Sequence, residues 1–211
     1  YEFTRDLGPI DWRHASAHSL YWARVGSLQA EKRAHNEDMT FKIINNDRMQ
    51  SQAMQDLARY GLITYDPLAN EMPSRLPDTR WIRIIDRFFE HLYVKHRNVD
   101  GWGPDNFIAF HKHFLESSVR ELYRLGDLEN AQAVLDRLDS LYGTQALIPN
   151  TEYTQPLETF VMKKTFEEYD MQPHVATTDV QNALYYGIRA GLGRGNRDVY
   201  NHAKEFADKV L

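Results

Sequence analysis

The sequence predicts an all-α protein built of irregular antiparallel helical hairpins, and three observations lead to this fold class. Apolar residues recur three or four positions apart along most of the 211 residues, which is the period of an amphipathic helix. Glycine and proline gather between these stretches, as in loops that connect helices. Strands and helices do not alternate, so neither a Rossmann fold nor a barrel is expected.

Composition limits the class of protein. A chain of 211 residues with 42% hydrophobic and 26% charged residues is long enough for one domain with a sizeable core, expected over residues 1–211. Its formal net charge of −5 argues against a nucleic-acid partner, because nucleic-acid-binding surfaces are usually basic. No apolar run approaches the roughly 18 residues of a membrane span. The absence of cysteine excludes disulfides, thiolate metal sites and cysteine nucleophiles.

The start of the chain and its aromatic content bear on location. The chain begins at Tyr1 and not at Met, which suggests a processed form or a part of a longer protein. Aromatic residues make up 12% of the chain, a content that favours a secreted or surface protein. We therefore expect an exported or cell-envelope location.

Helical periodicity places most of the elements. Helices are expected over residues 12–33, 49–60, 81–93, 107–125, 128–141, 156–169, 180–191 and 199–210. Asp11, residues 78–79 and residues 177–179 are expected to cap three of them, because their side-chain oxygens can accept from free backbone N–H groups of the first turn. Gly61 and Gly143 are expected to end two others.

Two segments outside these helices carry their own expectations. Phe41, Ile43 and Ile44 form a short apolar patch, interpreted as a helical turn or a brief extended segment, and residues 45–47 (Asn-Asn-Asp) are interpreted as a turn or cap. Residues 62–65 are β-branched and aromatic, as in a strand. Because no convincing partner strand is found, they predict an extended connector.

The clearest hairpin runs from Phe114 to Tyr142, where two amphipathic stretches are joined by Gly126-Asp127. An aromatic residue, Tyr123, stands late in the first helix, and a small residue, Ala131, early in the second. These residues resemble the tetratricopeptide repeat, a helical hairpin of about 34 residues. The sequence departs from the family pattern where Val119 replaces a preferred Gly and Gly143 a preferred Pro. The resemblance covers residues 114–142 and implies hairpins stacked as a tetratricopeptide-like α–α superhelix.

A shorter pattern occurs twice. Residues 20–23 read Leu-Tyr-Trp-Ala and precede Gly26 and Leu28, while residues 184–187 read Leu-Tyr-Tyr-Gly and precede Ala190 and Leu192. We interpret it as a recurring helix that packs a tyrosine outward from a close helix contact; chance recurrence of two common residues is the alternative.

The opening of the chain carries a second resemblance. Asp11-Trp12-Arg13, followed by residues 17–18 (Ala-His) and 21–23 (Tyr-Trp-Ala), is similar to bacterial proteins of the same helical type. This resemblance implies a helical scaffold, with an exported location.

Histidines offer the alternative function. His14 and His18 lie four apart, which puts both rings on one helix face, as zinc ligands require. The glutamate that zinc proteases place beside the first histidine is missing, because residue 15 is Ala. His111 belongs to a second group, but no matched Glu-x-x-His recurs on other helices, as a di-metal bundle needs. The alternative is therefore a metal-binding protein or metal-dependent enzyme using His14, His18 and His111, set against ordinary interhelical histidines.

Two further patterns have structural interpretations. Residues 191–196 are glycine-rich, yet they follow a helix and lack the GK[ST] ending of a phosphate loop, so they predict an inter-helix turn. Arg80, Arg83 and Arg87 lie on one helix with Asp86 and Glu90 among them, which indicates a self-paired solvated face.

Taken together, these patterns predict a non-catalytic scaffold without a cofactor. It would bind a protein or peptide partner, or act as a subunit of a larger assembly, through a face formed by stacked hairpins. The residues expected to contact the partner are aromatic side chains with neighbouring polar ones: Tyr21, Trp102, Tyr123, Asn182, Tyr185, Tyr186 and Arg189.

Overall fold

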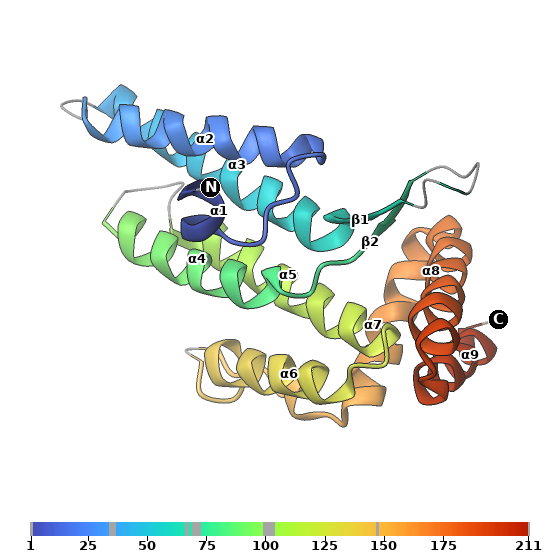
Figure 1. Cartoon of the computed structure of the whole chain (residues 1–211). Helices are drawn as coiled ribbons and strands as arrows, with labels where there is room; N and C mark the ends of the chain where they lie inside the picture. Colours follow the sequence, from blue (N-terminus) through green and yellow to red (C-terminus); the bar gives the residue numbers. More distant parts are fainter. Residues whose placement is uncertain are drawn as a thin grey trace. The chain divides into compact units, whose positions relative to one another are not determined.

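The computed structural model describes the whole chain except residues 1, 34–36, 66–67, 69–72, 99–103, 147 and 211. Helices dominate it, and a single two-stranded sheet is the only sheet among the described residues, so the all-α prediction is confirmed (Figure 1). Contacts group the chain into two compact units, Tyr1–His111 and Lys112–Leu211. The expected single domain over residues 1–211 stays a prediction.

The first unit contains four helices, the small sheet and the beginning of a fifth helix. In chain order these are α1 (Glu2–Leu7), α2 (Ala15–Glu31), α3 (Glu37–Tyr60), β1 (Leu62–Thr64), β2 (Ser74–Leu76), α4 (Trp81–His96) and the first turns of α5 (Pro104–Arg124). Its core is formed by fully buried apolar side chains of α2, α3 and α4: Leu20, Met54, Leu57, Trp81, Ile85 and Phe89.

Helices α2 and α3 form an antiparallel pair. Ser16 contacts Asp56 near one end, with Oγ to Oδ2 at 3.1 Å. Near the other end, a Cβ on residue 26 would lie 2.9 Å from Asn46 Oδ1, so the Asn46 side chain packs over Gly26.

The predicted break at residues 45–47 is wrong, because α3 runs without interruption from Glu37 to Tyr60. Asn46 and Asp47 are poor helix formers taken alone. Here Asp47 points into the core and accepts hydrogen bonds from Ser27 on α2 and Gln50 on α3. These tertiary contacts outweigh the local preference for a turn.

The predicted extended connector at residues 62–65 is wrong as well. Residues 62–64 form β1, which pairs antiparallel with β2 in the register Leu62↔Leu76, Ile63↔Arg75 and Thr64↔Ser74. The partner strand, Ser-Arg-Leu, has little β propensity of its own and was not recognisable from sequence.

The second unit contains the remainder of α5, four more α-helices and three short helical turns. In chain order these are α6 (Leu128–Tyr142), the 3₁₀ turn η1 (Glu152–Thr154), α7 (Leu157–Met171), α8 (Pro173–Tyr186), the π-helical turn η2 (Gly187–Gly191), the 3₁₀ turn η3 (Leu192–Arg194) and α9 (Arg197–Val210). Helix α8 begins four residues before the expected cap at 177–179, because Pro173 occupies its first turn, where proline fits.

A glycine turn joins α5 to α6, as predicted. Gly126 has a φ of +76°, and the N–H groups of Gly126 and Asp127 donate to Tyr123 O and Leu122 O, both at 2.9 Å. This is a Schellman motif, which satisfies the last carbonyls of α5. Asp127 then caps α6 by accepting from Asn130 N at 3.3 Å. The predicted helix–turn–helix over residues 114–142 is present, while tetratricopeptide-like stacking stays a prediction.

The same turn recurs before α9. Gly195 has a φ of +75°, its N–H donates to Leu192 O at 3.1 Å, and the N–H of Asn196 donates to Gly191 O at 2.8 Å. Asn196 then accepts from Val199 N at 3.4 Å, in the position that Asp127 occupies before α6. Two of the hairpins of this unit are thus closed by a glycine followed by an Asx cap.

Candidate functional site

An aromatic cluster lies on the α1–α2 surface of the first unit. Ring centroids of Tyr21 lie 4.8 Å from Phe3, 5.0 Å from Trp22 and 6.3 Å from Trp12, the last two in edge-to-face arrangements. Tyr21 is half-buried, while Trp22 is 67% exposed and Trp12 38% exposed. Tyr21, an expected contact residue, is therefore the centre of a cluster that reaches from the interior to solvent.

Hydrogen bonds fix the Asp11-Trp12-Arg13 segment that borders this cluster. Trp12 Nε1 donates to Thr4 Oγ1 at 3.2 Å, and a ring nitrogen of His18 lies 3.1 Å from Trp12 O. Arg13 pairs with Asp11, with Nη2 to Oδ2 at 2.5 Å, and also donates to Ile63 O of β1 at 3.0 Å. The Trp12 ring and its backbone are thus held in place beside Tyr21.

A second aromatic surface lies on α8 and η2 in the other unit. Tyr185 is 39% exposed, and the Arg189 guanidinium lies 4.9 Å from the centroid of its ring, a cation–π contact. Asn182 is exposed and Tyr186 is half-buried. Four of the expected contact residues (Asn182, Tyr185, Tyr186 and Arg189) therefore come from this one stretch of helix.

The repeated Leu-Tyr-aromatic-small pattern has similar surroundings at both places. Ala23 and Gly187, the small residues that follow the aromatic pair, are both buried. A Cβ on residue 187 would lie 2.7 Å from the Cβ of Ala203 on α9, so this helix approaches its neighbour closely. Trp22, next to Ala23, is exposed, whereas at the second place Tyr185 is exposed and Tyr186, next to Gly187, is half-buried.

Two expected contact residues do not belong to either surface. Tyr123 is only 6% exposed, because the ring of His202 on α9 packs edge-to-face on it at 4.7 Å and its carbonyl lies 2.5 Å from His202 Nε2. It is a core residue, so the expectation that it lines an exposed face is wrong. Trp102 lies outside the described residues.

Trp22, the most exposed ring of the α1–α2 cluster, was not among the residues expected from sequence. The available signal was its place on α2: the buried residues Leu20, Ala23 and Ser27 form one helix face, and Trp22 points away from it.

The three histidines of the alternative function have separate surroundings. His14 is the N-cap of α2, where its Nδ1 accepts from Ser16 N at 3.1 Å, and burial lowers its pKa. His111 Nε2 lies 2.8 Å from Asp86 Oδ1, and its ring stacks on Phe89. Across the part of the chain that the structure describes, no group of three or more His, Asp or Glu side chains is placed to hold a metal ion. His14, His18 and His111 therefore do not form a ligand set.

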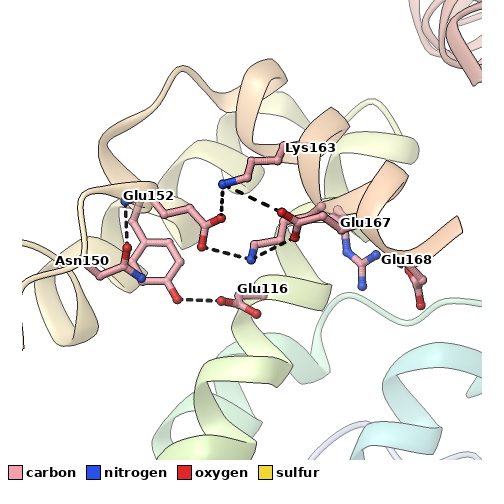
Figure 2. Close-up of polar contacts among 9 residues, drawn as sticks. Glu116, Asn150, Glu152, Lys163, Glu167 and Glu168 are labelled. Atoms are coloured by element: carbon pink, nitrogen blue, oxygen red, sulfur yellow. Dashed lines mark hydrogen bonds and ion pairs between the residues drawn. The ribbon is translucent and has the colours of Figure 1, made fainter. Parts of the chain in front are cut away.

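A polar cluster joins α5, η1 and α7 in the second unit (Figure 2). Tyr153 is buried and donates to Glu116 Oε1 at 2.6 Å; burial raises its pKa, and Glu116 raises it further. Glu152 accepts from Lys163 at 2.8 Å and from Lys164 at 3.0 Å. Because charges of opposite sign are matched inside this cluster, it has the character of a structural network that fixes η1 against two helices.

In comparisons with protein-family models, with curated proteins and with solved structures, no family, relative or structure matches this chain. Among the described helices, none combines the length and apolar character needed to cross a membrane.

Proposed function

We propose that this protein is a non-catalytic helical scaffold that binds a protein or peptide partner through the aromatic cluster of α1 and α2. The observation that carries the proposal is Trp22, which is 67% exposed although its neighbour Tyr21 packs edge-to-face against it at 5.0 Å. A large ring exposed to solvent leaves apolar area that a partner can cover.

Energetics support a binding role for such a cluster. Covering apolar surface contributes about 25 cal/mol per Å², and tryptophan and tyrosine are enriched among interface residues whose loss costs at least about 2 kcal/mol. The contacts that hold Trp12 and Tyr21 in place reduce the entropy that would be lost on binding.

The helical hairpins support a tetratricopeptide-like arrangement for the scaffold. In the second unit two hairpins have the same glycine turn, at Gly126 and at Gly195, followed by an Asx cap. Recurrent hairpins of one type are the units from which helical binding arrays are built. The partner would be a separate protein or another subunit of a shared assembly.

Selection from a random peptide library displayed on phage, with the whole chain immobilised, tests the proposal. We expect enriched peptides, and we expect Trp22→Ala to weaken their binding by about 2 kcal/mol, roughly thirtyfold. Phe41→Ala is the matched control, because Phe41 is an equally exposed ring on α3. No enrichment by the native chain, or equal weakening by the two variants, would contradict the proposal.

A further inference from the structure

The surface of α8 and the turns that follow it has a chemical character of its own. Tyr185, Ile188 and Leu192 are 39%, 53% and 44% exposed. They lie on α8, η2 and η3 in turn, three and four residues apart along the chain. We call these three exposed apolar side chains the apolar strip.

The charges along this stretch are positive up to Arg197, which the exposed Asp198 follows. Residues 180–197 contain three arginines (Arg189, Arg194 and Arg197) and no Asp, Glu or Lys, in a chain whose formal net charge is −5. All three arginines are exposed. Arg194 and Arg197 make no ion pair with any described residue, and the Arg189 guanidinium lies over the Tyr185 ring at the edge of the apolar strip.

Packing against α9 holds this surface in one conformation. A Cβ on residue 187 would meet the Cβ of Ala203 at 2.7 Å, and a Cβ on residue 191 would meet Tyr200 N at 2.9 Å. The N–H of Asn196 donates to Gly191 O at 2.8 Å, so Arg194 and Arg197 stand on either side of a closed turn. The backbone that carries the apolar strip and the arginines is therefore preorganised, which lowers the entropy lost on binding.

We infer that the surface formed by Tyr185, Ile188, Leu192, Arg189, Arg194 and Arg197 binds an acidic peptide segment that carries bulky apolar side chains. The inference rests on the proposed scaffold function and names the chemistry of a partner. Carboxylates of the peptide would pair with the arginine forks. Its apolar side chains would cover the strip, which a purely polyanionic ligand such as a nucleic-acid backbone would leave uncovered.

The phage selection described above is repeated on the whole chain and on two folded variants. One variant is Arg189→Gln, Arg194→Gln, Arg197→Gln. The matched control is Arg83→Gln, Arg87→Gln, Arg97→Gln, which removes three exposed arginines of the first unit. We expect a class of peptides with more Asp and Glu than Lys and Arg, together with Leu, Ile or aromatic residues. The synthetic form of the best of them should bind the first variant at least tenfold more weakly and the control variant equally well, and Tyr185→Ala should weaken it too.

The outcomes separate the inference from the function on which it rests. If the enriched peptides have no acidic excess, or bind the first arginine variant as well as the native chain, the inference fails and the scaffold function stands. If no peptide is enriched at all, both fail. A single-stranded oligonucleotide that displaces the acidic peptide at equal concentration would show a general polyanion site. A dimer seen by sedimentation and abolished only by the first variant would show a second copy as the occupant. Either result overturns the inference.

Discussion

His96 and Asp47 meet inside the first unit, with Nε2 of the histidine 2.8 Å from Oδ2 of the aspartate and both side chains buried. Lys95 Nζ lies 2.8 Å from the same carboxylate oxygen, and Ser27 Oγ donates to the other at 2.7 Å. The carboxylate therefore ties α3 to α2 on one side and to α4 on the other. It is the centre of a buried polar network within the first unit.

Replacing this carboxylate should destabilise the chain. Asp47→Asn removes the carboxylate that His96 and Lys95 contact, so that Lys95 keeps only Glu31 as a charged partner among the described residues. Breaking a buried charge pair costs about 3 kcal/mol or more. The difference in the free energy of unfolding between the native chain and Asp47→Asn, measured in urea, gives this cost. Asp56→Asn is the control, because Asp56 lies on the same helix but is exposed and accepts a hydrogen bond from Ser16. Equal stability of the two variants would contradict a central role for Asp47.

The same carboxylate predicts a loss of stability in acid. Burial alone would raise the pKa of Asp47, but hydrogen bonds from His96, Lys95 and Ser27 lower it below its ordinary value. Its stabilising contribution is therefore present above the pKa of the unfolded chain, roughly 3.9, and is lost as pH falls towards the lower folded-state value. The stability difference between the native chain and Asp47→Asn should shrink as pH falls from neutral through this range. A constant difference would contradict the assignment.

Asp179 should have the opposite pH dependence. Burial raises its pKa above the ordinary value, although Arg124 and the hydroxyl of Tyr169 act in the other direction, and the nearby carboxylates Glu121 and Glu168 raise it further. A raised folded-state pKa means that the stabilising contribution is present below the unfolded pKa, roughly 3.9, and is lost as pH rises through the folded value. Relative to the native chain, Asp179→Asn should therefore gain stability as pH rises through this window. For each variant, equilibrium unfolding at a series of pH values gives the stability difference from the native chain as a function of pH. The slopes for Asp179→Asn and Asp47→Asn should have opposite signs.

Gly187→Ala should damage the α8–α9 contact. The added methyl would lie 2.7 Å from the Cβ of Ala203, so the helices must separate, and overpacking of this kind typically costs about 1–3 kcal/mol. Gly193→Ala is the control, since the nearest atom to a Cβ there is Ile188 O at 3.6 Å. Thermal unfolding of the two variants should show a lower melting temperature for Gly187→Ala than for Gly193→Ala. An unchanged melting temperature for Gly187→Ala would contradict the close approach of α8 and α9.

Local patterns predicted the parts of this fold that depend on neighbours in sequence. The apolar stripe of α4 and the glycine at each hairpin turn are properties of a few consecutive residues, and they were recognisable. The continuity of α3 was not, because it depends on Asp47 finding partners on α2 and α4, up to 49 residues away. Propensity at Asn46 and Asp47 favours a turn, and only the folded core overrides it.

The candidate contact residues also divide into those suggested by local sequence and those whose exposure depends on distant contacts. Tyr21 was named from the repeated Leu-Tyr-aromatic-small pattern, whereas the exposure of Trp22 depends on which face of α2 is buried. Tyr123 was misjudged, because the side chain that covers it, His202, lies 79 residues further along the chain. Exposure of a single aromatic side chain is decided by such distant contacts and cannot be read from local spacing.

The glycine turns at Gly126 and Gly195 also constrain where residues can be inserted into this chain. Three residues separate α5 from α6 and two separate η3 from α9, and in both places these residues satisfy the end of one helix and the start of the next. One added residue would deprive both helix ends of hydrogen bonds at once. Insertions, affinity tags and fluorescent labels should therefore be tolerated poorly at these two corners and far better around the exposed Ile148, in the segment between α6 and η1.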